Sequence, residues 1–375
     1  MSTPDLYNLS PALRVMLMGL LIALGPLLWV GLRQRGAPVA RRLQALTLFT
    51  LFLTFDLVIF GAFTRLTDSG LGCPDWPGCY GSASPVGAQL HIAAAQSAMP
   101  SGPVTPTKAW IEMIHRYLAT GVGVLILTLT IVSWRERRRA HISPWWPTLT
   151  LFWVCLQGAF GALTVTMKLF PAIVTLHLLC GLALLALLRA QSARYAQEFG
   201  ALVPVVLSRT ARAGVFVAFG LLWLQIALGG WVSTNYAVLA CTDFPACQNS
   251  FWPAMDFTQG FTLWRELGAG RDGGNISFQA LTAIHYVHRL AAYLVFAVLL
   301  ALAVSLQRLP ALAKHARWLG GLTLLQAATG LSNVVLGWPL VAAVMHTGGA
   351  AALVVVLTAI IFSSRSVATP LRFSH

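Results

Sequence analysis

Residues 110–134 read WIEMIHRYLATGVGVLILTLTIVSW, a long apolar segment that begins with Glu112, His115 and Arg116. A segment of this length and composition is typical of a helix that spans a bilayer. Hydrocarbon cannot solvate a carboxylate, an imidazole or a guanidinium, so these three side chains need partners or a cofactor. The rest of the chain supplies candidate partners.

The composition of the 375-residue chain is that of an integral membrane protein. Hydrophobic residues make up 57% of it and charged residues only 10%, whereas soluble domains carry roughly a quarter charged residues. Apolar segments of about 20 residues can each span a bilayer. Nine such segments occur, at 13–32, 44–64, 110–134, 147–167, 171–190, 212–233, 281–306, 316–337 and 340–362. The sequence therefore predicts an all-α integral membrane protein.

The basic residues predict the orientation in the membrane. A net charge of +14 would suggest a nucleic-acid partner for a soluble protein, but here the basic residues lie in short runs between apolar segments, so none is expected. Seventeen Lys and Arg residues fall on one side, in 33–42, 135–139, 189–212, 308–317 and 365–372. Six fall on the other side, namely Arg14, Arg65, Lys108, Lys168, Arg265 and Arg271. The first side is expected to be cytoplasmic, which puts the N-terminus outside and the C-terminus inside.

The last eight apolar segments form two matching sets of four. Gly61, Cys73, Asp75, Pro77 and Cys79 recur at a constant offset as Gly229, Cys241, Asp243, Pro245 and Cys247. Further along, His115 and Arg116 recur as His288 and Arg289, and Gln157, Gly161 and His177 recur as Gln326, Gly330 and His346. Three separate segments keep one order and nearly one offset, which indicates internal duplication.

The duplication predicts two pseudo-symmetric four-helix bundles, because four helices return the chain to the same side and give parallel repeats. An extra N-terminal transmembrane helix and a cytoplasmic linker occupy 1–43. The first bundle is expected at 44–195 with an outer loop at 65–109, and the second at 205–365 with an outer loop at 235–280. Long ordered loops of this kind are usually functional.

Four of the nine histidines follow the repeat, namely His115, His177, His288 and His346. Each lies a few residues inside the outer end of its predicted helix, at a depth of about 6–12 Å for a rise of 1.5 Å per residue. Two imidazoles facing each other in a four-helix core suit the axial positions of a haem iron. Alternatively, each histidine bonds a backbone carbonyl or a neighbouring helix. Zinc fits less well, because no consistent thiolate or carboxylate completes its coordination.

Arginine and glutamate side chains accompany these histidines. Arg116 and Arg289 each follow a candidate ligand, where a guanidinium suits a haem propionate and snorkelling to lipid headgroups is the alternative. Glu112 is matched by His285, so only the first half has a carboxylate one helical turn from its histidine. Spacing alone leaves Glu112 either as a catalytic group or as the ion-pair partner of Arg116.

The two outer loops each contain a cysteine pair, Cys73 with Cys79 and Cys241 with Cys247. Both pairs lie on the side where disulfides persist. They are not haem-attachment motifs, which read C-x-x-C-H. We expect one disulfide within each loop; a redox or delivery role for the first pair is a sharper hypothesis.

Over residues 45–362 the chain resembles the haem A synthase family. The likeness rests on GAFTRLTDSGLGCPDWPGCYG at 61–81, then on Glu112, His115-Arg116, His177, His288-Arg289 and His346. Members have eight core helices in two pseudo-symmetric bundles, so the first helix here is a departure. The resemblance implies oxidation of the C8 methyl group of haem O, through an alcohol and a geminal diol, to the formyl group of haem A for cytochrome oxidase.

The resemblance also implies roles for the site residues. His288 and His346 are expected to be the two axial ligands of haem b, with Arg289 beside it. His115 and His177 are expected to bind the substrate haem O, with Arg116 nearby and Glu112 as the catalytic carboxylate. The implied location is the bacterial cytoplasmic membrane, and the implied partners are haem O synthase and cytochrome oxidase assembly factors. The electron acceptor is not identified, and a homo-oligomer is compatible with the sequence.

Two other functions use the same pattern. A di-haem b-type electron carrier would need the four histidines without modifying any haem, and a haem transporter would use parallel repeats. The pairing of Glu112 with His285 argues against both, because a pure carrier has no evident reason to break the symmetry there.

Overall fold

The computed structural model describes residues 9–138, 142–270 and 274–366. Three residues of the charge count, Arg139, Arg271 and Arg372, lie outside these ranges. The long helices are α1 (Ser10–Arg33), α2 (Val39–Leu66), α4 (Pro106–Glu136), α5 (Trp145–Thr166), α6 (Pro171–Glu198), α7 (Arg209–Thr234), α9 (Phe278–Gln307), α10 (Ala313–Val335) and α11 (Leu340–Phe362). The short elements are η1 (Pro85–Ala88), α3 (Gln89–Ala98), β1 (Val205–Leu207), η2 (Ala237–Ala240), α8 (Phe257–Gly260) and β2 (Ser364–Ser366).

The prediction of an all-α integral membrane protein is confirmed. Each predicted apolar segment corresponds to one long helix, and eight of the long helices in the described ranges have the length and composition of a membrane span. The exception is α10, which has 23 residues but contains Lys314, His315 and Arg317 near its N-terminus. It packs against both α9 and α11.

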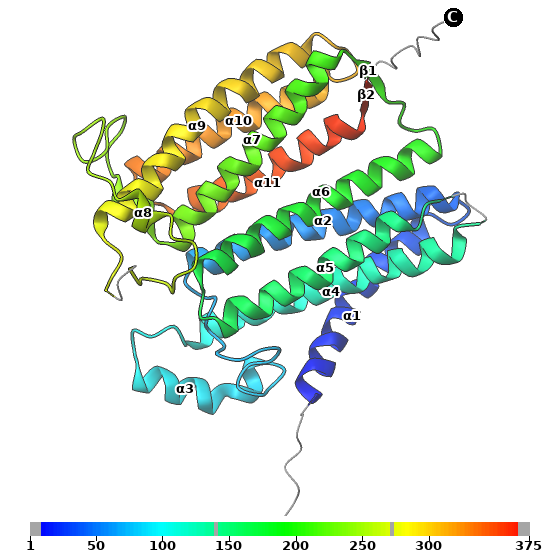
Figure 1. The fold of residues 1–375 in the computed structure, drawn as a ribbon. Coiled ribbons are helices and arrows are strands. Elements are labelled where there is room, and N and C mark those ends of the chain that lie inside the picture. The colour runs from blue at the N-terminus through cyan, green and yellow to red at the C-terminus, as the bar shows by residue number, and fades with distance from the viewer. Residues whose placement is uncertain (1–8, 139–141, 271–273, 367–375) are drawn as a thin grey trace, which may run out of the picture.

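The helices after α1 pack in two groups of four (Figure 1). The first bundle consists of α2, α4, α5 and α6, and the second of α7, α9, α10 and α11. Between the bundles, α11 packs against α2 and α6, and α6 packs against α7. The segments 67–105 and 235–277 extend from one end of both bundles, on the left in Figure 1. We call this end the loop face.

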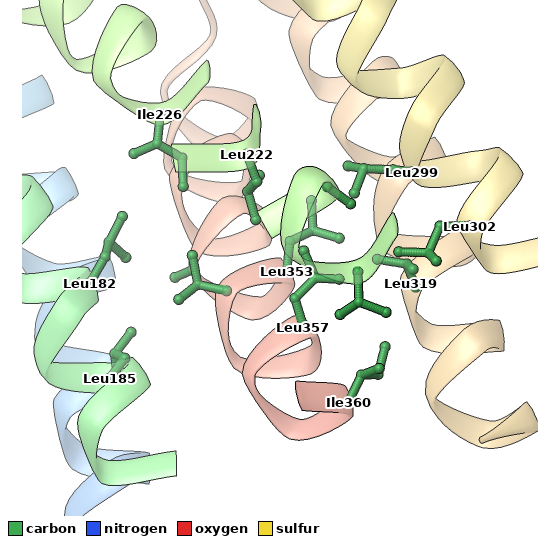
Figure 2. Packing of buried hydrophobic residues seen from close by; sticks show 14 of the residues in the cluster. Leu182, Leu185, Leu222, Ile226, Leu299, Leu302, Leu319, Leu353, Leu357 and Ile360 are labelled. Atoms are coloured by element: carbon green, nitrogen blue, oxygen red, sulfur yellow. The ribbon is translucent and has the colours of Figure 1, made fainter. Parts of the chain in front are cut away.

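A continuous hydrophobic core joins the second bundle to the first. Its members come from α2, α4, α6, α7, α9, α10 and α11, and Figure 2 labels Leu182, Leu185, Leu222, Ile226, Leu299, Leu302, Leu319, Leu353, Leu357 and Ile360. Leu185 and Leu357 are completely buried, at 0% exposure. Burying side chains of this size stabilises a fold by about 1.5–3 kcal/mol each when water is the alternative. Here the core chiefly fixes how the helices meet, because lipid is as apolar as leucine.

Local sequence explains where the two helices with the His-Arg pair begin. Thr105 precedes α4, and its side chain accepts the N–H of Lys108 at 3.2 Å. Ser277 precedes α9 and accepts the N–H of Ala280 at 3.2 Å. Such caps satisfy backbone donors that the first helical turn leaves unpaired. Both helices therefore start at a defined residue on the loop face.

The extra helix α1 packs closely against α4. A Cβ atom at Gly19 would lie 2.5 Å from Cγ2 of Thr120, and one at Gly121 would lie 2.9 Å from Cγ2 of Ile22. Small residues let two transmembrane helices approach this closely. Much of α1 faces away from the bundle, with exposed side chains at Leu13, Leu17, Leu21, Leu28 and Leu32.

The bundles also contact each other at the loop face. Arg65 donates to the carbonyl oxygen of Ser233 at 2.6 Å and lies over the ring of Tyr236, 4.1 Å from its centroid. The Tyr236 hydroxyl donates to Asp68 at 2.6 Å. Arg65 and Ser233 are separated by the repeat offset, as are Asp68 and Tyr236, so each bonded pair consists of repeat counterparts. Counterparts can meet only near the pseudo-symmetry axis.

The short elements were not predicted from the sequence. The outer loop of the first half contains the helix α3 with η1 before it, and the opposite end of the protein has a parallel pair of strands, β1 and β2. Arg212 donates to the carbonyl oxygen of Ser364 at 2.9 Å beside these strands. The two strands join the segment between α6 and α7 to the end of α11 (Figure 1).

Candidate paired-histidine sites

Each bundle contains two of the repeat-matched histidines near the loop face. His115 of α4 pairs with His177 of α6, and His288 of α9 pairs with His346 of α11. The two helices of each pair belong to the same four-helix bundle, and all four histidines lie toward the loop face. The fold therefore brings the four histidines together as two separate pairs.

Every one of these imidazoles packs against a glycine of the neighbouring helix. A Cβ atom at Gly61 would lie 3.0 Å from Cε1 of His115, and one at Gly229 would lie 2.9 Å from Cε1 of His288. The same distance is 3.3 Å for Gly161 and His177 and 3.2 Å for Gly330 and His346. Ordinary contacts of a Cβ atom begin at 3.4 Å. A larger residue would push the ring away, so these four glycines determine where the imidazoles lie.

The donor set suits a haem better than a bare metal ion. Across the part of the chain that the structure describes, no three His, Cys, Asp or Glu side chains are grouped to hold a metal ion. Haem supplies its own equatorial ligands and takes only axial ones from the protein. In the first bundle, Nδ1 of both His115 and His177 is buried without a partner among the described residues. Such unpaired atoms are costly and are a feature of functional sites.

Glu112 lies one turn before His115 and is only 4% exposed. Its carboxylate accepts the N–H of Cys73 at 2.8 Å and forms an ion pair with Arg116. The ion pair that the spacing allowed is therefore present, together with a contact to the outer loop. These contacts fix the carboxylate near the first histidine pair. A catalytic role for Glu112 stays a prediction.

The second bundle has a different contact at the corresponding place. His285, the counterpart of Glu112, is 5% exposed, and its Nδ1 lies 3.0 Å from the carbonyl oxygen of Ala237. A neutral bond to the backbone thus replaces the ion pair of the first bundle. The break in symmetry seen in the sequence is a difference in the chemistry of the two sites.

Arg116 and Arg289 hold the disulfide loops. Nη1 of Arg116 donates to the carbonyl oxygen of Asp75 at 2.9 Å. Nη1 of Arg289 donates to the carbonyl oxygens of Asp243 at 2.9 Å and Ala246 at 2.7 Å. A guanidinium has several N–H donors, so these contacts do not use all of its capacity. The propionate contacts expected for both arginines stay predictions.

Both loops share one construction. Disulfides join Cys73 to Cys79 and Cys241 to Cys247. Within the second loop, the carboxylate of Asp243 accepts the N–H groups of Gln248 at 2.8 Å and Asn249 at 2.9 Å. The hydrogen bond from the Asn249 N–H is the main reason that the pKa of Asp243 lies below its ordinary value of 3.8. Asp75 makes the same two contacts in the first loop.

The sequence did not predict that two polar side chains lie beside the second histidine pair. Oγ1 of Thr329 lies 2.9 Å from Nδ1 of His346, and Nε2 of Gln225 lies 3.1 Å from Nδ1 of His288. Their counterparts in the first half are apolar. A search of the two halves for polar residues present in only one of them would have found both.

Fold and site together define a class of protein: a multi-pass membrane protein of two duplicated four-helix bundles, each with a half-buried pair of histidines. A family profile described as cytochrome oxidase assembly protein matches residues 44–358. The chain therefore belongs to the haem A synthase family of cytochrome oxidase assembly proteins. Helix α1 lies outside the matched residues.

Several relatives are named heme A synthase. The protein from Shewanella oneidensis is 38% identical over 316 residues, which is 83% of this chain and 93% of the relative. The one from Sinorhizobium fredii is 28% identical over 335 residues, covering 83% and 86%. The one from Halalkalibacterium halodurans is 25% identical over 312 residues, covering 81% and 91%. The similarity therefore extends over both bundles.

Proposed function

We propose that this chain is a haem A synthase, which oxidises the C8 methyl group of haem O through an alcohol and a geminal diol to the formyl group of haem A. One observation carries the proposal: the two bundles have matched histidine pairs, but among the described residues only the first has a carboxylate, Glu112, beside its pair. The name shared by the relatives supports the same reaction.

The two bundles have different roles in this proposal. In the second, His288 and His346 would hold haem b, which when bound would supply one-electron redox chemistry. The first binds haem O between His115 and His177. Glu112 lies one turn from His115 and takes up a proton released as the methyl carbon is oxidised. Its contacts with the outer loop support a fixed position for that proton transfer.

The protein lies in the bacterial cytoplasmic membrane with its loop face outside. The unequal distribution of Lys and Arg supports this orientation, as do the disulfides at the loop face. Haem O synthase and cytochrome oxidase assembly factors are the proposed partners, since haem O must be delivered and haem A passed on. A farnesylated haem is apolar enough to enter from lipid.

The reaction is tested by co-expressing the chain with a haem O-producing enzyme and separating the extracted pigments by chromatography. Hydroxylated haem and formyl haem are the expected products. An assembled and reducible preparation that yields neither of them would refute the proposal, and would favour an electron carrier or a transporter.

The roles of single residues are tested in the same assay. Glu112→Gln keeps an oxygen that accepts the Cys73 N–H, so we expect a normal b-type spectrum with conversion stopped or halted at the alcohol. Glu136→Gln at the far end of α4 is the matched control and should convert haem O normally. Full conversion by Glu112→Gln would remove its catalytic role. His346→Ala should lose the bound haem b, whereas His91→Ala in the exposed helix α3 should keep it.

A further inference from the structure

The Nδ1 atoms of the four paired histidines have different surroundings in the two bundles. In the second bundle, His346 has Thr329 at 2.9 Å and His288 has Gln225 at 3.1 Å. In the first bundle, neither Nδ1 atom has a hydrogen-bond partner in the described part of the chain. One pair of imidazoles is thus bonded to side chains, and the other is not.

The repeat traces this difference to two substitutions. The offset that relates His177 to His346 places Phe160 at the position of Thr329. The offset that relates Gly61 to Gly229 places Leu57 at the position of Gln225. The helices and the glycine contacts correspond in both bundles. The side chains that could bond Nδ1 are therefore absent from the first bundle for reasons of sequence.

The Thr329 hydroxyl contacts a backbone carbonyl oxygen and the His346 ring. Its Oγ1 donates to the carbonyl oxygen of Leu325, one turn earlier in α10, at 2.8 Å. A hydroxyl has a single proton, so with that proton donated to Leu325 the same oxygen accepts from Nδ1 of His346, and this assigns the Nδ1-protonated tautomer to the ring. The other ring nitrogen, Nε2, then keeps its lone pair for a metal. Gly330, the residue after Thr329, contacts the same ring at Cε1.

A hydrogen bond of this kind strengthens a histidine ligand. Metal-bound histidines usually donate their second N–H to an oxygen, which fixes the tautomer and the ring orientation and raises the basicity of the ligand. Losing such a partner typically lowers metal affinity by about 10–100-fold. A more basic axial ligand also favours ferric iron and so lowers the reduction potential of a haem.

We propose that Thr329 is the positioning residue that makes His346 a permanent ligand of a resident haem, and that the apolar Phe160 leaves its counterpart His177 an exchangeable one. The inference deepens the proposed function and rests on it, since it takes the second bundle as the site of the resident haem. It accounts for a protein that must keep one haem while binding and releasing another.

The test uses full-length protein with His177→Ala, so that only the second bundle holds haem. Thr329→Val removes the hydroxyl and keeps the shape, and Thr329→Ser restores the hydroxyl. In Thr329→Val we expect haem transfer to apomyoglobin to be about 10–100-fold faster, with a more positive midpoint potential in a redox titration. Thr329→Ser should return both values to those of the His177→Ala parent. If Thr329 had only a structural role, Thr329→Val would not shift the midpoint potential, and Thr329→Ser would have no shift to reverse.

The reciprocal variant, Phe160→Thr in the otherwise unchanged chain, should slow haem release from the first bundle. If Thr329→Val leaves the transfer rate and the potential unchanged, or Phe160→Thr leaves release unchanged, the inference is wrong. If the His177→Ala parent contains no haem at all, the assignment of a resident haem to the second bundle fails instead. The two failures are therefore distinguishable.

Discussion

The close contact between glycines and imidazoles gives a prediction with an internal control. Gly229→Ala places a Cβ atom 2.9 Å from Cε1 of His288, whereas Gly220→Ala in the same helix, α7, meets nothing within 4 Å. Two further helices offer the same comparison, Gly330 against Gly321 in α10 and Gly161 against Gly158 in α5. Each pair makes the same chemical change in the same helix.

The magnitude follows from two opposing effects. Alanine stabilises a helix interior by about 0.8–1.0 kcal/mol relative to glycine, and this is all that we expect at Gly220. Forcing an extra methyl group into a packed site costs about 1–3 kcal/mol. At Gly229 the two effects together change the free energy of unfolding by between nearly zero and a loss of about 2 kcal/mol, so the protein still folds. However, the contact must open from 2.9 Å to at least 3.4 Å, and the His288 ring must move.

The assay compares haem bound per protein, the Soret spectrum and thermal unfolding in each pair of variants. Gly229→Ala should bind haem about 10–100-fold more weakly, as expected for a disturbed ligand, and Gly220→Ala should bind it normally. Wild-type haem content and spectrum in Gly229→Ala would refute the argument. Equal losses in both variants would refute it too, because the effect would then not depend on the imidazole.

Two further predictions concern the outer loops. Replacing Cys73 and Cys79 by serine should lower the rate of haem O conversion more than the same change in the second loop, because only the first loop donates an N–H to Glu112; equal decreases at matched stability would contradict this. The depressed pKa of Asp243 means that its N–H contacts are complete above its ordinary value of 3.8 and are lost as pH falls through the lower folded value. Hydrogen-exchange protection of the Gln248 and Asn249 amides should therefore fall only below pH 3.8. Asp243→Ala removes both acceptor oxygens and should lose that protection at neutral pH; unchanged protection in this variant would exclude the role of the carboxylate.

The long helices could be predicted from the sequence because a membrane span needs a continuous apolar segment, and that signal is local. The boundaries were less accurate: α2 extends over Val39–Leu66, whereas the apolar segment covers only 44–64. Helix α3 and the pair of strands β1 and β2 were not predicted. A two-stranded pair of this size has little stability of its own and depends on tertiary contacts.

At the site, the repeat in the sequence was sufficient to select the four histidines and to single out Glu112. It left open whether Glu112 pairs with Arg116, and the structure shows that pair together with the Cys73 N–H. The sequence favoured haem propionates as partners of the arginines, whereas the contacts seen are to carbonyl oxygens of the disulfide loops. Bonds between a helix and a distant loop cannot be read from spacing within the helix.

The sequence by itself determined that this is a duplicated membrane protein and which of its histidines are equivalent, because apolar length and residue order are properties of the chain. Only the tertiary structure decided which residues touch those histidines. The contact of Thr329 with His346 joins two helices, and it depends on how each helix is rotated about its axis in the bundle. That rotation is set by packing of the whole core, so no single segment encodes it.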